Sequence, residues 1–185
     1  MAITVFVWDA HVDMYGHASL SIDGGAYVSW WPSGELEGKG HTKGNGMLGS
    51  RAMASTMKTD KRSEKRIPSW ASAPITCLDE DAIGQWWGQQ SGRSGTLADE
   101  KRDTRSNGRY NVLTSSCAGK VFEALVVGGL HKNPAADAIA GQLGLVISPN
   151  DIQDLAAALS GELGFWDTAK FAIPTDVRNA WNYLL

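Results

Sequence analysis

At the centre of this sequence lies Tyr110-Asn-Val-Leu-Thr-Ser-Ser-Cys-Ala-Gly-Lys-Val-Phe-Glu-Ala-Leu125. The segment predicts a short extended entry, a polar turn and then an amphipathic helix over about 114–127, because apolar side chains recur at helical spacing from Val121 to Val126. Gly128-Gly129 predicts the end of that helix. Cys117 falls in the first turn, where the helix dipole and free N–H groups favour a nucleophilic thiolate. The alternative is a small buried residue that only packs.

Strands are expected before this segment. Residues 3–8 (ITVFVW) are rich in β-branched and aromatic side chains, and the runs 17–22 and 26–31 flank an Asp23-Gly24-Gly25 turn that predicts a hairpin. Residues 34–75 show no clear period and contain the mostly basic run KTDKRSEKR at 58–66. We expect a loop-rich insertion there, with the charged run on a solvated face.

Helices are expected to dominate the second half of the chain. Helix-start signals and apolar spacing predict helices over about 79–90, 134–143 and 149–160 and from 174 to the C-terminus, with a polar loop over 91–109. Strands early and helices late indicate an α+β fold, and 185 residues suit a single domain over 1–185.

Composition excludes several classes of protein. A net charge of −3 argues against a nucleic-acid binder, and two cysteines are too few for a disulfide framework. The sequence contains no run of about 18 apolar residues, so we expect no membrane span. The N-terminus lacks the basic region of a signal peptide, so we expect synthesis in the cytoplasm and no use of the general secretory route.

Cys117 and His17 are the first candidate catalytic pair. A cysteine hydrolase needs a thiolate, a histidine that exchanges protons with it and a third polar group that orients the imidazole. His17 begins a predicted strand, and Ser29 lies opposite a position near Ala18 across the hairpin, so Ser29 is the candidate orienting group. The alternative for His17 is a strand-edge histidine bonded to a backbone carbonyl. Cys77 is the poorer nucleophile, because the carboxylates that follow it disfavour a thiolate.

Two other kinds of site remain open. Oxygen and nitrogen ligands crowd together at Asp9, His11, Asp13 and His17, but no zinc motif accompanies them, and we expect neither a metal ion nor a cofactor. The adjacent pairs Trp30-Trp31 and Trp86-Trp87 are compatible with a non-enzymatic binding module that stacks on a sugar or a partner. Neighbouring residues on a strand face opposite sides, so we expect one ring of the first pair in the core.

Three segments together resemble the circularly permuted papain-like superfamily, which includes permuted NlpC-type peptidases and the lecithin:retinol acyltransferase group. These are Gly16-His17-Ala-Ser-Leu, Tyr27-Val-Ser-Trp-Trp-Pro32, and Tyr110 to Cys117 with Ala124-Leu125 and Gly128-Gly129. In that superfamily the histidine strand and the third polar residue precede the cysteine helix. The SWWP strand and Ser-Pro-Asn-Asp151 are most similar to the TseH-like effectors of the type VI secretion system.

The resemblance implies a small antiparallel sheet packed against the cysteine helix, with Cys117 as nucleophile, His17 as general base and acid, and Ser29 in the third position. It implies amide hydrolysis through a thioester, with peptidoglycan stem peptides as the first substrate to test. A protein- or lipid-directed acyl hydrolase or transferase is the runner-up. By the same resemblance, the expected partners are an immunity protein and a component of the secretion apparatus, and the site of action is the periplasm of a target cell.

Overall fold

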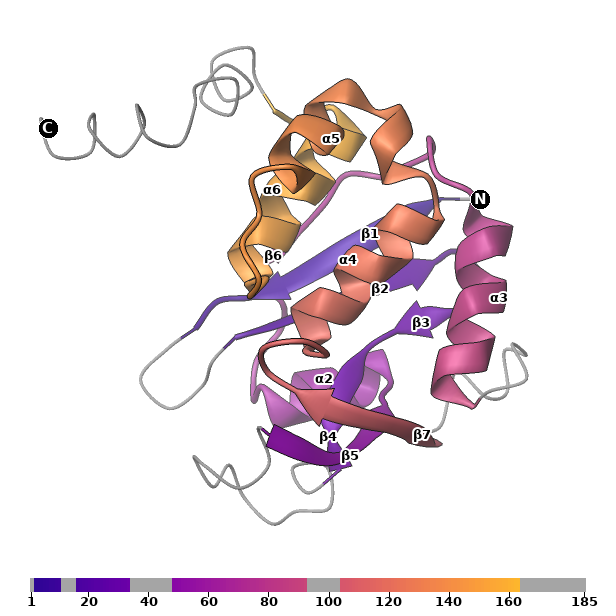
Figure 1. The fold of residues 1–185 in the computed structure, drawn as a ribbon, viewed down its shortest axis with the longest axis vertical. Helices are drawn as coiled ribbons and strands as arrows, with labels where there is room; N and C mark the ends of the chain where they lie inside the picture. The colour runs from indigo at the N-terminus through magenta and orange to yellow at the C-terminus, as the bar shows by residue number, and fades with distance from the viewer. Residues whose placement is uncertain (1, 11–15, 34–47, 93–103, 164–185) are drawn as a thin grey trace, which may run out of the picture.

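The computed structural model describes residues 2–10, 16–33, 48–92 and 104–163. This part of the chain folds as two small antiparallel sheets with helices packed against them, which confirms the expected α+β class (Figure 1). No helix in it is both long enough and apolar enough to cross a membrane.

The first sheet contains the predicted N-terminal strands. Its strand order is β3-β2-β1-β6, with bounds Ile3–Trp8 for β1, His17–Ile22 for β2, Tyr27–Val28 for β3 and Trp70–Ala71 for β6. The register of β1 and β2 runs from Ile3 opposite Ile22 to Trp8 opposite His17. The predicted hairpin is confirmed, and Gly24 takes the left-handed conformation (φ 68°) that its turn requires.

The second sheet has the order β4-β5-β7, with β4 at Trp30–Pro32, β5 at Leu48–Ala54 and β7 at Thr104–Asn111. Only Ser29 separates β3 from β4, and its carbonyl accepts a hydrogen bond from the Ser55 amide at 3.1 Å. One continuous extended segment therefore leaves the first sheet and enters the second at Ser29.

Two predicted loops are wrong where the structure describes them. The expected insertion over 34–75 contains β5, helix α2 (Met57–Ser63) and β6, while 34–47 lies outside the described residues. Helix α2 gave no apolar period because the side chains that it buries, such as Asp60, are polar. The expected loop over 91–109 includes most of β7. This strand is stabilised by tertiary contacts, namely its pairing with β5 and the close approach of Gly108 to the Trp30 ring, which local sequence does not predict.

The remaining helices lie close to their predicted positions. Their bounds are Glu80–Ser91 for α3, Cys117–Val127 for α4, Leu130–Lys132 for the 3₁₀ turn η2, Pro134–Ala140 for α5 and Pro149–Ser160 for α6. The helix expected from 174 onward falls outside the described residues.

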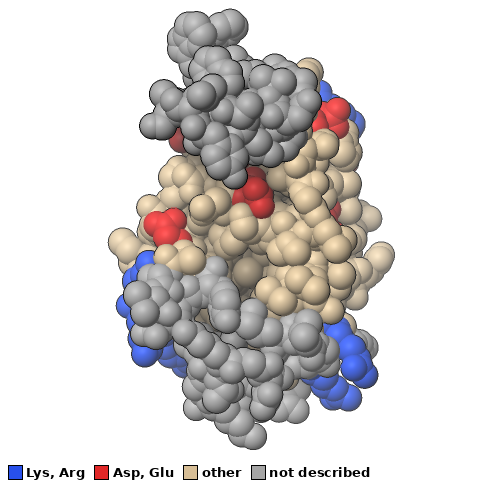
Figure 2. Space-filling model, turned by 60° about the vertical axis from the view of Figure 1, so that its left-hand side comes forward, with Lys and Arg blue, Asp and Glu red and all other residues tan. Residues whose placement is uncertain are grey.

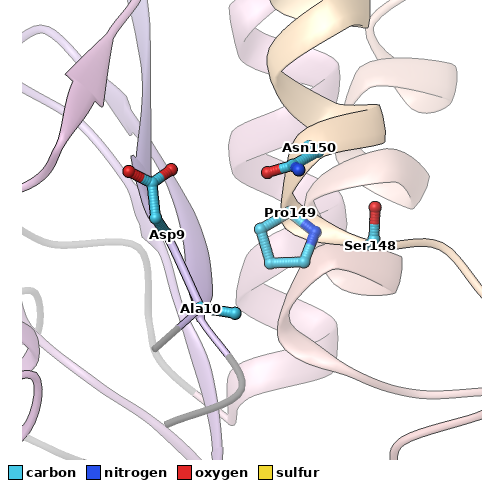
Figure 3. A pocket seen from close by; sticks show the side chains of 5 residues that line it. All are labelled: Asp9, Ala10, Ser148, Pro149 and Asn150. Carbon is cyan, nitrogen blue, oxygen red and sulfur yellow. The ribbon is translucent and has the colours of Figure 1, made fainter. Parts of the chain in front are cut away.

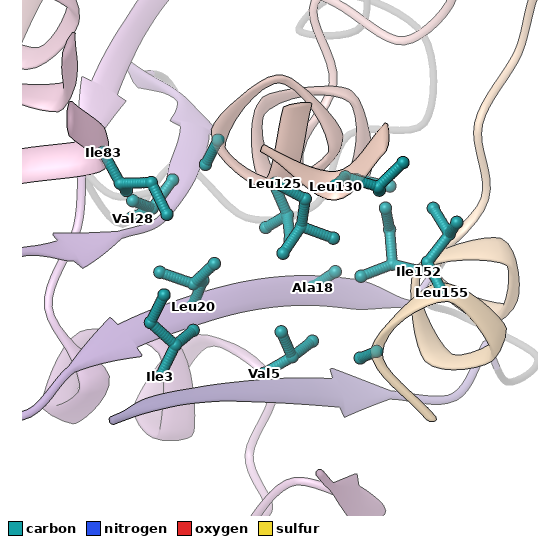
Figure 4. Close-up of a cluster of buried hydrophobic side chains, with 14 of the residues drawn as sticks. Ile3, Val5, Ala18, Leu20, Val28, Ile83, Leu125, Leu130, Ile152 and Leu155 are labelled. Atoms are coloured by element: carbon teal, nitrogen blue, oxygen red, sulfur yellow. The ribbon is translucent and has the colours of Figure 1, made fainter. Parts of the chain in front are cut away.

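Helix α4 is the centre of the hydrophobic core. It lies across the first sheet, between α3 on one side and α6 on the other (Figure 1). Leu125 points down onto Ala18 and Leu20 of β2, and Ile152 and Leu155 of α6 complete the cluster (Figure 4). This packing fixes the first turn of α4 beside the start of β2, where His17 begins the strand.

Candidate active site

Cys117 is the first residue of α4. The preceding residue, Ser116, is the N-cap, and its hydroxyl accepts a hydrogen bond from the Gly119 amide at 3.0 Å. The N–H groups and the positive end of the helix dipole at this position favour an anionic sulfur. Cys117 is largely buried and keeps 8% of its surface exposed.

The ring of His17 is fixed between two tryptophans. Trp8, its register partner on β1, lies 5.3 Å away between ring centroids, and Trp31 stacks on the imidazole at 4.4 Å with an interplanar angle of 27°. His17 is 1% exposed, so its ring has little room to turn. The alternative of a histidine held only by a backbone carbonyl is wrong, because side chains bond its ring.

The structure brings Ser29 to His17 as predicted, but it adds a carboxylate that the sequence did not suggest. The Nε2 atom of His17 lies 3.2 Å from Ser29 Oγ and 3.1 Å from Asp60 Oδ2. Ser29 in turn donates to Asp60 Oδ1 at 3.0 Å. Asp60 is therefore the stronger orienting group, and Ser29 supports both residues.

Asp60 is fully buried at the centre of a set of hydrogen-bond donors. Its Oδ1 atom accepts from Trp31 Nε1 at 2.8 Å as well as from Ser29, and its Oδ2 atom accepts from the Tyr27 hydroxyl at 2.6 Å as well as from His17. Burial raises the pKa of Asp60, but the charge of His17 and hydrogen bonds from His17, Tyr27 and Ser55 outweigh burial and lower it overall. The carboxylate is thus held ionised inside the protein.

The pKa shifts of Cys117 and His17 show that the two side chains interact through charge and a hydrogen bond. Burial lowers the pKa of His17, but the charges of Asp60 and Cys117 and a hydrogen bond to each raise it to about 10. Burial raises the pKa of the Cys117 thiol, but the His17 charge and hydrogen bonds from His17 and from the backbone at Ala18 and Ala118 lower it overall. Because Nε2 faces Asp60, Nδ1 is the nitrogen left to face the sulfur. The favoured state is an imidazolium beside a thiolate.

Sequence reasoning missed Asp60 because it lies within the basic run at 58–66, which indicated a solvated face. One local signal was present: Thr56 caps α2 by accepting from the Thr59 amide, which places Asp60 in the first turn of a short helix. The identity of its partners depends on the tertiary fold, because they come from β2 and from the segment that joins the two sheets.

Apart from Trp31, which donates to Asp60, the other candidate residues that the structure describes take no part in this network. His11 and Asp13 fall outside the described residues, and among those described, no three His, Cys, Asp or Glu side chains are grouped as a metal site would require. Cys77 is exposed and its thiol donates to the Leu159 carbonyl. Trp30, Trp31 and Trp87 are all buried, so the tryptophan pairs do not form an exposed stacking surface. Trp30 packs in the hydrophobic core, as expected for one ring of that pair, and Trp31 instead faces His17 and Asp60.

No similarity to a known protein accompanies this arrangement of Cys117, His17 and Asp60. No family model matches this chain, and no curated protein or solved structure does either.

Proposed function

We propose that this chain is a cysteine-dependent amide hydrolase of permuted papain-like type. One observation carries the proposal: His17 bonds Cys117 on one side and the buried Asp60 on the other. Such hydrolysis requires a nucleophile, a base that exchanges protons with it and a polar group, here a carboxylate, that orients the base. The order of histidine strand, Ser29 and then cysteine helix along the chain supports the permuted arrangement.

The chemistry follows from the protonation states. The Cys117 thiolate attacks the carbonyl carbon of an amide, and the electron pair of the C=O bond moves to oxygen. Backbone N–H groups at the start of α4 are the donors for that oxyanion. As the C–N bond breaks, His17 gives its proton to the leaving amine, and a thioester remains on Cys117. His17 then takes a proton from water, the hydroxide attacks the thioester, and the acid leaves with the thiolate restored.

The proposed substrate is an amide bond in a peptidoglycan stem peptide, and the proposed role is that of an antibacterial effector delivered by a specialised secretion system. Both come from the resemblance of three sequence segments to NlpC-type enzymes and TseH-like effectors. An immunity protein in the producing cell belongs to the same proposal.

Expression in a bacterial host tests this function. Wild type, Cys117→Ala and the matched control Cys77→Ala are directed either to the periplasm or to the cytoplasm, and the stem peptides of the recovered cell wall are analysed by mass spectrometry. We expect lysis and new cleaved stem peptides only with periplasmic wild type and Cys77→Ala. Equal toxicity of Cys117→Ala would refute cysteine catalysis and favour a binding module. Toxicity that requires Cys117 but leaves the cell wall intact would select a protein or lipid acyl bond instead.

A further inference from the structure

A cavity of about 280 Å³ lies beyond the end of β1. Asp9 and Ala10 line it on one side, and Ser148, Pro149 and Asn150 at the start of α6 line it on the other (Figure 3). This volume is near the lower end of the range for small-molecule sites, about 300 Å³, and has room for one amino-acid side chain or a short linear group. Figure 2 shows that this side of the molecule is hollowed near its centre, with acidic and uncharged side chains close to the hollow and Lys and Arg farther out.

The hydroxyl and amide at the α6 end of the cavity are already bonded. The Ser148 amide and hydroxyl both bond the Asp151 carboxylate, at 2.7 and 2.8 Å, and the Asp151 amide returns a bond to Ser148 Oγ at 3.2 Å. This capping box supplies the helix end with its own anion. Asn150 is different, because its side-chain amide reaches into the cavity toward Asp9 (Figure 3).

Among the described residues that line the cavity, Asp9 is the one with a charged side chain. The backbone of Asp9 is fixed, because its amide donates to Ser69 Oγ at 3.0 Å and its carbonyl accepts from Arg66. The same Arg66 nitrogen also lies 3.7 Å from the Glu64 carboxylate. The fixed backbone therefore presents the Asp9 carboxylate to the space between β1 and α6.

The cavity is close to the candidate active site. Asp9 follows Trp8, whose ring packs on His17 and which is opposite His17 in the sheet. From the spacing of paired strands and of consecutive residues, the Cα atoms of Asp9 and His17 lie within about 10 Å. An extended peptide bridges that span with roughly three residues, so one substrate can occupy both places.

We propose that this cavity is a substrate subsite for a primary ammonium group, held by the Asp9 carboxylate and the Asn150 side-chain carbonyl. An ammonium is a compact charge with three N–H donors, so two bond these oxygens and the third remains for water. Within the described lining of the cavity, one carboxylate and one neutral amide match one positive charge and are fewer ligands than a divalent cation needs. The subsite deepens the proposed function: it makes the preferred substrate a peptide that carries a free amine near the cleaved bond.

Binding to a catalytically inactive protein tests this subsite independently of hydrolysis. The probe is the peptide L-Ala-γ-D-Glu-L-Lys-D-Ala, and its control is the same peptide with both amines acetylated. Each peptide is titrated into full-length Cys117→Ala, and binding is followed by the NMR shifts of the Asp9, Ala10 and Asn150 amides. We expect shifts at these amides with the free peptide and affinity for the acetylated peptide about tenfold weaker or more, since a hydrogen bond between charged groups is lost. Asp9→Asn abolishes this preference, and Asn150→Lys, which places a competing ammonium in the cavity, does the same. The control Asp23→Asn, at the exposed hairpin turn, keeps it.

Each outcome decides one of the two proposals. Equal affinity for both peptides, no shift at Asp9 and Asn150, or a preference that survives Asp9→Asn would overturn the subsite. If wild type cleaves free and acetylated peptides equally well, the hydrolase stands and the subsite falls. If wild type cleaves neither peptide while Cys117→Ala still prefers the free amine through Asp9, the subsite stands and the proposal of stem-peptide hydrolysis falls.

Discussion

Replacing Asp60 with asparagine separates the charge of this side chain from its shape. The raised pKa of His17, from 6.5 to about 10, corresponds to about 5 kcal/mol in favour of the imidazolium, achieved against burial. Asp60 is the larger of the two attractions behind that rise. Breaking a buried charge pair costs about 3 kcal/mol or more, so loss of the Asp60 charge should lower the population of the reactive thiolate by up to about a hundredfold.

Iodoacetamide measures that population without any knowledge of the substrate, because only the thiolate reacts. The assay is the rate of Cys117 alkylation at neutral pH in a Cys77→Ser background, followed by mass spectrometry. We expect Asp60→Asn to slow the reaction about a hundredfold. Ser29→Ala, which removes the hydrogen bonds to His17 and Asp60 but no charge, should slow it about tenfold or less.

Folding has to be checked in both variants. An asparagine amide can accept the bonds of Ser29 and Trp31 through its oxygen, but its NH₂ group then faces His17 and Tyr27, so Asp60→Asn is also expected to lower stability by a few kcal/mol. The alkylation rate is compared where near-UV circular dichroism shows both proteins folded. An alkylation rate within threefold of wild type in folded Asp60→Asn would refute the reasoning, because the Asp60 carboxylate would then not stabilise the thiolate–imidazolium pair.

Three further predictions concern pH and the backbone around the site. The first concerns the pH window between the unfolded pKa values of His17 (6.5) and Cys117 (9.0). In this window the wild-type pair binds one proton in each state, on the imidazole when folded and on the thiol when unfolded. The contribution of the pair to the free energy of unfolding should therefore not change with pH there. In Cys117→Ala, folded His17 keeps a proton that the unfolded chain loses above pH 6.5. The contribution of His17 to the free energy of unfolding is therefore complete below pH 6.5 and declines as pH rises toward the folded pKa, by up to about 1.4 kcal/mol per pH unit. Urea titrations of both proteins across this window measure the difference. Gly16→Ala would place a Cβ atom 2.7 Å from the Trp8 carbonyl at a residue with φ 78°, so we expect a loss of about 2 kcal/mol and a Tm lower by roughly 6 °C, whereas Gly24→Ala has open space and should lose less. Ser116→Ala removes the N-cap of α4 and should cost about 1 kcal/mol in thermal unfolding, which Ser116→Thr restores.

The sequence predicted those parts of the fold whose signals are local. The strand at 3–8, the hairpin with its Asp-Gly-Gly turn and the helix at 149–160 were all visible because apolar spacing, turn glycines and caps act within a few residues. Strand β7 was missed because TRSNGRYN has little strand propensity, and β5 was missed within a segment that showed no period. Pairing between them supplies what propensity does not.

The same division holds for the site. Cys117 and His17 were identifiable because a helix start and a strand start are local features, and Ser29 followed from the geometry of one hairpin. Asp60 was not, because its burial depends on the tertiary contacts of α2 with β2 and with the segment 27–31. A charged residue in a basic run is solvated in most proteins, and local sequence gives no reason to expect otherwise here.

One sequence pattern nevertheless implied an acceptor of this kind. In the segment Tyr27-Val-Ser-Trp-Trp31, residues 27, 29 and 31 share one face of an extended chain, and Val28 and Trp30 share the other. The second face packs into the hydrophobic core, while the first presents a phenol, a hydroxyl and an indole N–H, all of which donate to Asp60. Three converging donors in a buried place need an acceptor with about four lone pairs, and a carboxylate is the side chain that offers them. A strand with alternating donors and core residues therefore predicts a buried anion opposite it, and the fourth position on that anion is the one that His17 occupies.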